Sequence, residues 1–480
     1  MSKHISDSHL AAGGYRGRRG QQHIARAVCA LALALFAGTC AADVFRLIDS
    51  DQDAAQVRVD MIERARAEIL LSLHRASDDY LVLSYLALLR KAARRGVKVR
   101  FLIDSAFNEL SKGIQAQLLA AGIEIKEYHP VRVTRIRWTN QRLHDKMIVT
   151  DRTHLLLGGR NLENPFFGIT KKSYAKKLYV DRDAYVRGEA AALAAEYFME
   201  LWHSKEVFDV SLGTYDPKSA QQTCDTSLDD VSYELCTELH SWTRTNMDRA
   251  SAAMESNLAE LKQSRFVHLN PGKDWSAGQR EDVDVRFLHD PIGRKGIEPG
   301  TFETFLDYVN RAERSIAIES PYLILSDNSQ EVLRRAIKRG VRVRVLTNSL
   351  ASTQNLFAQG GYEGKKADLV QMGLEIWEFK GPKMLHAKSV VIDDEIALVG
   401  NFNIDPRSEF YNTELAVVAR DQRLARQLRS SMDANLENAW LIGPDAKPIG
   451  ESERFPGASA GKIFKLRLYQ LVAPAIRNQL

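Results

Sequence analysis

A repeated strand–helix–strand block constrains the fold of this chain more than any other feature of its sequence. The first copy opens at residues 65–69 (Ala-Arg-Ala-Glu-Ile) and closes at residues 96–105 (Gly-Val-Lys-Val-Arg-Phe-Leu-Ile-Asp-Ser). The second copy opens at residues 312–316 (Ala-Glu-Arg-Ser-Ile) and closes at residues 340–349 (Gly-Val-Arg-Val-Arg-Val-Leu-Thr-Asn-Ser). Because the two closing glycines lie 244 residues apart, the repeating unit is a whole domain and not a short solenoid repeat.

Each copy has the order of elements that builds a sheet covered by helices. An apolar strand comes first, at 69–73 and 316–318, and an amphipathic helix follows that ends at glycine. A strand rich in β-branched residues comes next, at 97–103 and 341–346. This β-α-β order predicts an α/β fold with parallel or mixed sheets, in two duplicated domains whose sheets are flanked by helices.

The chain is long enough for both copies and a connecting segment. Its 480 residues correspond to two to four domains of about 100–200 residues each. The stretch between the copies is polar and weakly periodic, and we interpret it as an insertion with one helix near residues 233–261. The predicted parts are a signal peptide or N-terminal membrane anchor (1–42), a first domain (43–205), the insertion (206–280), a second domain (281–445) and a C-terminal tail (446–480). The apolar part of the tail either packs against the body or lies on a membrane, and we favour packing.

The N-terminal segment has the pattern of an export signal. Residues 1–42 contain five basic residues and a single acidic one, and they turn apolar from Ala27 onward. The apolar run is shorter than the roughly 20 residues that a membrane span needs and ends in small residues, which favours a cleaved secretory signal. Lipidation at Cys40 and an uncleaved anchor remain open alternatives. We therefore expect an exported protein that is periplasmic or membrane-associated.

The net charge says little about a partner, because most of it lies in the N-terminal segment. The chain carries +5, of which residues 1–42 supply +4. The rest is nearly neutral and has no basic stripe interleaved with aromatic residues, so we expect no nucleic acid as partner. With 45% hydrophobic and 26% charged residues, the chain is neither a disordered nor a polytopic membrane protein.

Two cysteines, Cys224 and Cys236, lie in the polar insertion. Their spacing fits no metal site, so we expect no metal there. In an exported chain, a disulfide between them and a pair of free thiols are both open interpretations.

Both domains carry the same motif, His-x-Lys-x4-Asp-x6-Gly-x-x-Asn. Its members are His144, Lys146, Asp151 and Asn161 in the first domain, and His386, Lys388, Asp393 and Asn403 in the second. The two histidines lie 242 residues apart, nearly the offset of the strand–helix–strand blocks. The motif therefore belongs to the domain repeat.

The motif brings together the groups that a phosphodiester reaction needs. Residues i and i+2 of a strand point to the same face, so each histidine projects with the lysine two positions later. The glycine-containing turn lets the backbone return closely and presents the asparagine. Two ammonium groups offset the phosphate charge, two carboxamides donate hydrogen bonds, and two imidazoles supply a nucleophile and a general acid. One copy alone would favour a structural histidine, whereas two copies at matched offsets favour catalysis.

With these motifs the sequence resembles the phospholipase D superfamily, whose members carry two H-K-D motifs per chain. The resemblance spans nearly all of residues 44–445 and is greatest to bacterial cardiolipin synthases of the C-type. The matching phrases are Asn140-Gln-Arg142, Gly158-Gly-Arg-Asn161 followed by Phe167-Gly168, Thr347-Asn-Ser349, Gly361-Tyr362, Asp405-Pro-Arg-Ser408 and Asn412-Thr-Glu414. The resemblance implies two pseudo-symmetric halves with one shared active site at their interface. It also implies transfer through a covalent phosphohistidine without a metal or another cofactor.

The resemblance further implies how the motif residues divide the work. His144 would be the nucleophile and His386 the general acid, with the reverse assignment still open. The phosphate would be held by Lys146, Lys388, Asn161 and Asn403.

The acidic residues would support the histidines. Asp151 and Asp393 complete the catalytic motifs and would mainly brace them. Glu414 would accept a hydrogen bond from one histidine and set its tautomer. For the same task in the first half we choose Asp183 over Asp181.

Three departures from the synthase pattern bear on the substrate. Residues 72–75 read Ser-Leu-His-Arg where synthases tend to show a Gln and Tyr pair, a histidine is missing before Gly361, and Asn401 replaces a serine. His74 lies on the first strand of the repeat and is a candidate for the site. None of these positions belongs to the histidine–lysine core, so they affect the headgroup or acceptor that fits.

The leading hypothesis is a phosphatidyltransferase at a membrane surface. It would make cardiolipin from phosphatidylglycerol, with a second phosphatidylglycerol or phosphatidylethanolamine as partner. The first alternative is a phospholipase D hydrolase that releases phosphatidic acid, which differs only in using water as acceptor. A nuclease of the same superfamily and a catalytically inactive lipid-binding protein are the others. The oligomeric state stays open.

Overall fold

The structure, a computed structural model, describes residues 43–132, 134–170, 177–213, 224, 226–227, 229–269, 273–280, 282–294 and 300–472. Residues 1–42, on which the predictions of a signal peptide, lipidation or an anchor fall, lie outside the described residues. Asp43–Leu480 form one compact unit. Within the described ranges, no helix is both long enough and apolar enough to cross a bilayer.

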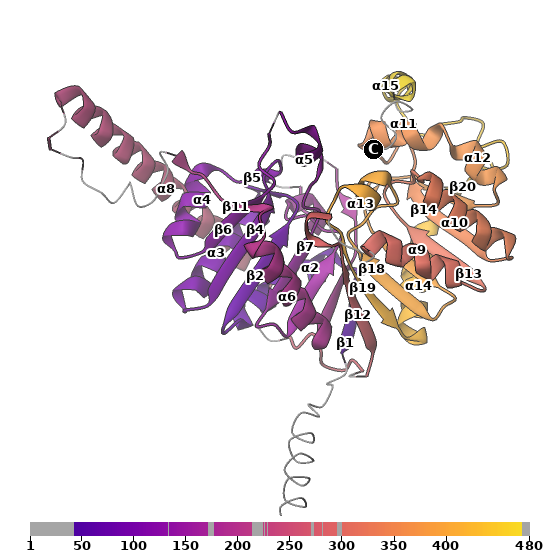
Figure 1. The fold of residues 1–480 in the computed structure, drawn as a ribbon, viewed down its shortest axis with the longest axis horizontal. Helices are drawn as coiled ribbons and strands as arrows, with labels where there is room; N and C mark the ends of the chain where they lie inside the picture. The colour runs from indigo at the N-terminus through magenta and orange to yellow at the C-terminus, as the bar shows by residue number, and fades with distance from the viewer. Residues whose placement is uncertain are drawn as a thin grey trace, which may run out of the picture. The chain divides into compact units, whose positions relative to one another are not determined.

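Two eight-stranded mixed sheets form the framework of this unit, and their strands follow the same order. The order in the first sheet is β1 (Val44–Ile48), β10 (Asp183–Arg187), β8 (His154–Gly158), β7 (Lys146–Thr150), β2 (Glu68–Leu73), β4 (Lys98–Asp104), β6 (Glu124–Tyr128) and β11 (Val207–Asp209). The order in the second is β12 (Asp284–His289), β19 (Leu415–Arg420), β18 (Ile396–Gly400), β17 (Ser389–Ile392), β13 (Ser315–Glu319), β14 (Arg342–Asn348), β15 (Glu375–Phe379) and β20 (Ala439–Leu441). Each strand has a counterpart in the other half, which confirms the predicted duplication and the mixed α/β sheets (Figure 1).

The repeated block forms the parallel centre of each sheet. β2 pairs with β4 in parallel, and β13 pairs with β14 in the same way. The connecting helices, α3 (Tyr80–Arg94) and α10 (Asp327–Lys338), end beside Gly96 and Gly340. Both glycines have a φ of +92°, which a residue without Cβ adopts without strain. The predicted glycine stops are therefore the points where the chain turns from helix to strand.

Helices cover both sheets and bury their apolar sides against them (Figure 1). The first half also contains α2 (Asp51–Arg64), α4 (Lys112–Ala120), α5 (Ile136–Asn140), α6 (Glu189–His203) and a 3-10 helix at Asn164–Phe167. The second half also contains a 3-10 helix at Ile292–Arg294, α9 (Thr301–Arg311), α11 (Leu356–Glu363), α12 (Lys366–Gln371), α13 (Pro406–Phe410) and α14 (Gln422–Leu436). A short parallel pair, β3 (Ala76–Ser77) and β5 (Asn108–Glu109), lies beside the first sheet.

One hydrophobic core joins the two halves. It contains side chains of β8 and β10 from the first sheet, of β18 and β19 from the second, and of the helices α6 and α14. A two-stranded parallel sheet also crosses the interface, where β9 (Tyr179–Val180) pairs with β16 (Met384–Leu385). Arg182 adds a buried ion pair to Glu319, with 2.5 Å between Nη1 and Oε2. The halves therefore share one interior, and the residues that follow β9 and β16 lie side by side.

The connecting insertion consists largely of one helix. α8 (Asp230–Ser264) lies where a helix was predicted near residues 233–261, and it packs against α3 and α4. A disulfide joins Cys224 and Cys236 near its beginning. β11 continues the first sheet to Asp209, beyond the predicted domain end at residue 205, because its backbone pairs with β6. In the tail, α15 (Ala460–Val472) packs against α11, as we favoured.

Candidate active site

Each motif histidine precedes a buried strand and is held by a carboxyl group of the opposite half. His144 lies before β7, and its Nδ1 is 2.8 Å from Oε2 of Glu414 in the second half. His386 lies before β17, and its Nδ1 is 2.7 Å from Oδ2 of Asp181 in the first half. This exchange of carboxyl groups places both histidines in one site at the interface.

Backbone pairing between the halves explains why Asp181 holds His386. In the pairing of β9 with β16, Val180 lies opposite Leu385. His386 N also donates a hydrogen bond to the carbonyl of Val180, at 2.8 Å. The residue after Val180 therefore lies beside the imidazole of the residue after Leu385.

The sequence favoured Asp183 as the residue that orients His386, but Asp183 has a different role. It is the first residue of β10, and its Oδ2 lies 3.0 Å from Nη1 of Arg58 and 3.3 Å from Nη1 of Arg160. The buried guanidinium group of Arg160 and the half-buried one of Arg58 need a buried anion, and Asp183 provides it. The prediction of Asp183 as the histidine-orienting acid was wrong because the pairing of β9 with β16, which sequence spacing does not reveal, decides which acid reaches His386.

Glu414 is fixed by polar side chains around it. Its Oε1 accepts hydrogen bonds from Oγ of Ser408 at 2.6 Å and from Nδ2 of Asn412 at 3.1 Å. Oγ1 of Thr413 accepts from the backbone N–H of His144 at 3.1 Å. Burial raises the pKa of Glu414 well above its usual range. Sequence reasoning assigned no role to these three neighbours, although all of them stand in phrases that carry the family resemblance.

Burial disfavours the charged form of both imidazoles. Burial, reinforced by Lys146, lowers the pKa of His144 well below its usual range. Burial and then Lys388 lower the pKa of His386 to about 4. Burial alone would raise the pKa of Asp181, but the interactions with His386 and Lys388 outweigh it and lower that pKa. Because Nδ1 of each ring contacts a carboxyl group, Nε2 is the nitrogen left for the reaction.

The two motif lysines are buried and repel each other. Burial lowers the pKa of Lys146 to about 7, with Lys388 as the next cause, and burial lowers the pKa of Lys388 to about 8. Nζ of Lys146 donates to the carbonyl of His144 at 2.8 Å, and Nζ of Lys388 lies 3.0 Å from Nε2 of His386. A phosphate anion between the two ammonium groups would raise both pKa values, because an opposite charge stabilises the protonated form.

Asn161 and Asn403 lie just after β8 and β18. Oδ1 of each is buried and has no hydrogen-bond partner among the residues that the structure describes. An unsatisfied buried amide oxygen costs about 1–3 kcal/mol. A turn of the amide would present the NH₂ group of Asn161 in its place, whereas Asn403 already hydrogen-bonds Asp405. Both side chains are therefore suited to a ligand, and their contact with phosphate stays a prediction.

The motif aspartates brace the backbone and do not touch the histidines. Asp151, at φ +50°, accepts hydrogen bonds from the backbone N–H groups at positions 66, 67 and 68. Asp393, at φ +56°, does the same for positions 313, 314 and 315. Each carboxylate thus fixes the backbone where the first strand of its repeat begins, β2 or β13. Asp151 and Asp393 thus have the bracing role that the resemblance implied for them.

His74 lies beside His144, as its strand position suggested. Its Nδ1 is 2.7 Å from the carbonyl of Leu143, and its ring centroid is 4.9 Å from that of His144. Burial, followed by the charge of Lys146, lowers the pKa of His74 well below its usual range. The site therefore contains a third imidazole, in the stretch where the sequence departs from the synthase pattern.

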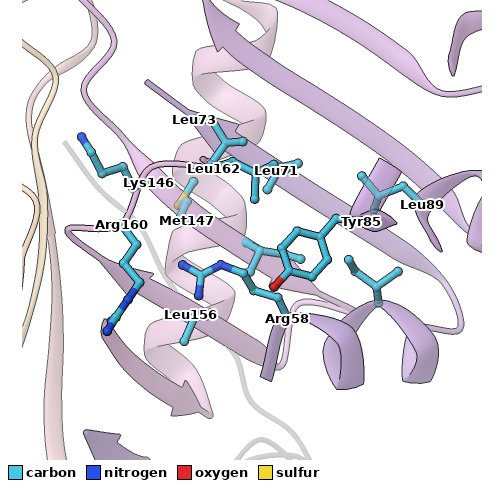
Figure 2. Close-up of a pocket in the computed structure, with 12 residues that line it drawn as sticks. Arg58, Leu71, Leu73, Tyr85, Leu89, Lys146, Met147, Leu156, Arg160 and Leu162 are labelled. Carbon is cyan, nitrogen blue, oxygen red and sulfur yellow. The ribbon is translucent and has the colours of Figure 1, made fainter. Parts of the chain in front are cut away.

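An apolar pocket lies behind the catalytic strand β7 (Figure 2). Its apolar lining comes from α2, α3, β2, β7, β8 and the turn after β8: Ile62, Leu71, Leu73, Tyr85, Leu89, Met147, Ile148, Leu156 and Leu162. Lys146 lies at one edge with its ammonium group turned away from these side chains, and Arg58 and Arg160 lie along the same wall (Figure 2). The apolar wall keeps water from the stem of Lys146, in keeping with its low pKa.

The fold and the site together define a class of protein: a duplicated α/β enzyme with one phosphoryl-transfer site made from two histidines and two lysines. The family follows from comparison with known proteins. The family model described as cardiolipin synthase, PLD-like domain, matches residues 59–202 and 305–436, one segment in each half. These segments cover more than half of the chain. The chain therefore belongs to this family and is an enzyme of the phospholipase D superfamily.

Individual relatives match most of the chain at low identity. Cardiolipin synthase C of Escherichia coli (strain K12) is 24% identical over 435 residues, covering 83% of this chain and 86% of the relative. An uncharacterised protein of Helicobacter pylori (strain J99) is 25% identical over 423 residues, covering 82% and 80%. The crystal structure of phosphatidylserine synthase from Haemophilus influenzae covers 91% of this chain and 95% of its own, with a TM-score of 0.62 and 13% identity. This structural match shows a shared fold.

Proposed function

We propose that this enzyme is a phosphatidyltransferase that makes cardiolipin from phosphatidylglycerol, with a second phosphatidylglycerol or phosphatidylethanolamine as partner lipid. The observation that carries the proposal is the crossed pair of contacts, His144 with Glu414 and His386 with Asp181, which brings two imidazoles into one site. Relatives over most of the chain that are named cardiolipin synthase support a phospholipid substrate.

The proposed reaction has two steps. Nε2 of His144 attacks the phosphorus of the donor lipid, which is phosphatidylglycerol or phosphatidylethanolamine. The bond to the leaving glycerol or ethanolamine oxygen breaks, and protonated His386 gives that oxygen its proton. The phosphatidyl group is then bound to His144. A hydroxyl group of a phosphatidylglycerol acceptor attacks the phosphorus, His386 takes up its proton, and the P–N bond breaks.

The residues around the histidines support each step. A phosphodiester anion raises the pKa of His386, because the opposite charge favours the imidazolium, and Asp181 favours the same form. Lys146 and Lys388 offset the charge that grows on the phosphoryl oxygens in the transition state. The scheme requires no metal ion, and residues of the chain supply the nucleophile, the acid and the cations.

We place the reaction on the exported side of a membrane. The basic and then apolar segment at 1–42 supports this placement. The disulfide between Cys224 and Cys236 supports it as well, since such bonds persist in oxidising compartments.

The test uses residues 43–480 with phosphatidylglycerol vesicles, with and without phosphatidylethanolamine, in the presence of a chelator. The lipids are then resolved. Cardiolipin as product supports the transferase. Phosphatidic acid alone would show a hydrolase, and arrest by the chelator would disprove the metal-free scheme. Cleavage of DNA with no change in the lipids would refute the lipid substrate.

A further inference from the structure

An exposed patch of apolar and basic side chains lies on α11 and α15; we call it the α11–α15 patch. Its apolar members are Phe357, Phe464 and Leu468, which are 41%, 64% and 49% exposed. Its basic members are Lys465 and Arg467, both exposed. Neither of them has an ion-pair partner within the part of the chain that the structure describes. Large apolar side chains are costly to leave in water, so a cluster of them indicates a binding surface.

The patch is the outward side of a helix whose inward side is packed. Phe464 and Leu468 are four residues apart, so they share one face of α15. On the other side Leu466 is fully buried, and the ring of Tyr469 lies 4.0 Å from that of Phe357 on α11. The helix is thus held in place by its buried face.

The charge of the patch distinguishes it from the apolar surface of α8. α15 contains three basic residues, with Lys462 as the third, and no acidic one. α8 also exposes apolar side chains, at Val231 and Leu235. However, the beginning of α8 carries acidic residues at positions 229, 230, 234 and 238. A surface of anionic phospholipids attracts the first helix and repels the second.

Hydrogen bonds join α15 and the segment before β9 to the same loop, residues 351–353. Nζ of Lys462 donates to the carbonyls of Ala351 and Thr353, at 3.1 and 2.6 Å. Nζ of Lys177 donates to the same carbonyl of Ala351 at 3.1 Å. Lys177 lies two residues before β9, whose partner β16 leads directly to His386. In Figure 1, α11 and α15 lie at the same end of the sheets as α5 and α13, the helices just ahead of His144 and Glu414.

We propose that the α11–α15 patch docks the enzyme on a bilayer that contains anionic phospholipid and so brings the catalytic site to the membrane surface. The benefit of this docking to the reaction rests on the proposed function, whereas the binding itself does not. Phe464 and Leu468 enter the boundary between headgroups and acyl chains, and Lys465 and Arg467 contact the lipid phosphates.

The test is co-sedimentation of residues 43–480, a compact unit that lacks the apolar N-terminal run, with phosphatidylcholine vesicles with and without phosphatidylglycerol. We expect Phe464→Ser/Leu468→Ser to weaken binding to both kinds of vesicle about tenfold or more. Lys465→Ser/Arg467→Ser removes the preference for phosphatidylglycerol, since the remaining affinity is apolar.

The matched control is Val231→Ser/Leu235→Ser on α8, which leaves vesicle binding unchanged. Equal loss of binding in this control, or binding by the Phe464→Ser/Leu468→Ser variant at the level of the wild type, would overturn the proposal. Ultracentrifugation gives a further check. If the wild type is a dimer and the Phe464→Ser/Leu468→Ser variant is a monomer, the patch binds a second copy of the chain, which would also overturn the proposal.

A second assay keeps the two proposals apart. With phosphatidylglycerol dispersed in detergent micelles, turnover by the patch variants stays within about twofold of the wild type, because their substitutions lie outside the catalytic residues. Vesicle binding without any lipid turnover by the wild type would refute the proposed function and leave docking standing. Full turnover by a wild type that does not bind vesicles would refute docking and leave the proposed function standing.

Discussion

Replacing Asp181 by asparagine tests whether the carboxyl groups exchanged between the halves drive the reaction. Oδ2 of Asp181 lies 2.7 Å from Nδ1 of His386, and the carboxyl group is buried. Asp181→Asn removes the charge that stabilises the imidazolium and offers an NH₂ group that reverses the tautomer. Breaking a buried charged pair costs about 3–5 kcal/mol, and each 1.36 kcal/mol is tenfold in rate. We therefore expect kcat to fall by a factor on the order of 10² to 10⁴.

The matched control is Asp183→Asn, two positions along the chain. Asp183 lies between Arg58 and Arg160, so its neutral analogue leaves one buried and one half-buried guanidinium group short of an anion. We expect the free energy of unfolding to fall by about 3–5 kcal/mol, with kcat of the folded fraction almost unchanged.

The assay measures lipid turnover in detergent micelles together with urea unfolding for both variants. The reasoning requires opposite patterns: Asp181→Asn stays folded and slow, and Asp183→Asn is active and less stable. An Asp181→Asn enzyme with more than a tenth of the wild-type kcat would refute it. So would an Asp183→Asn enzyme that is stable and inactive.

Further predictions follow from the same contacts. His144→Ala and His386→Ala should each abolish turnover, and activity in His386→Ala would contradict the two-histidine scheme. In a pH profile, kcat/KM should fall as the pH rises above about 7–8, because Lys146 and Lys388 lose their protons there, with pKa values of about 7 and 8; a flat profile up to pH 10 would argue against charged lysines in the site. Asp393→Asn should lower the free energy of unfolding by about 1–3 kcal/mol without changing kcat, because three backbone N–H groups lose a charged acceptor. Since those hydrogen bonds outweigh burial and lower the pKa of Asp393, its stabilisation is present above the ordinary pKa of an aspartate and is lost as the pH falls through the lowered value. Arg182→Met should destabilise the protein by about 3–5 kcal/mol, and Arg182→Met/Glu319→Leu should recover much of that loss in urea unfolding, because the pair is buried between the halves.

The sequence predicted the features that depend on local pattern. These features are the β-branched strands, the glycine stops at positions 96 and 340 and each copy of the motif. The residues that make up any one of them lie close together in the chain, and the structure contains each of them. The choice of Glu414 also succeeded, because a phrase matched to the family carries it.

Contacts between distant segments could not be predicted in the same way. Asp181 reaches His386 only through the pairing of β9 with β16, and these residues are 205 positions apart. The same holds for Thr413, which contacts the backbone of His144 from the other half. The domain end at residue 205 missed β11, because a three-residue strand has too little periodicity to stand out in a polar stretch.

Trapping the covalent intermediate tests the two-histidine mechanism most directly. A phosphodiester with a nitrophenol leaving group needs no general acid in the first step, but the second step still needs His386 to take a proton from the acceptor. In His386→Ala, the phosphoryl group should therefore accumulate on His144, as an acid-labile adduct that peptide mass spectrometry locates. Nitrophenol release without any adduct, or an adduct on His386 in the His144→Ala variant, would contradict His144 as the nucleophile.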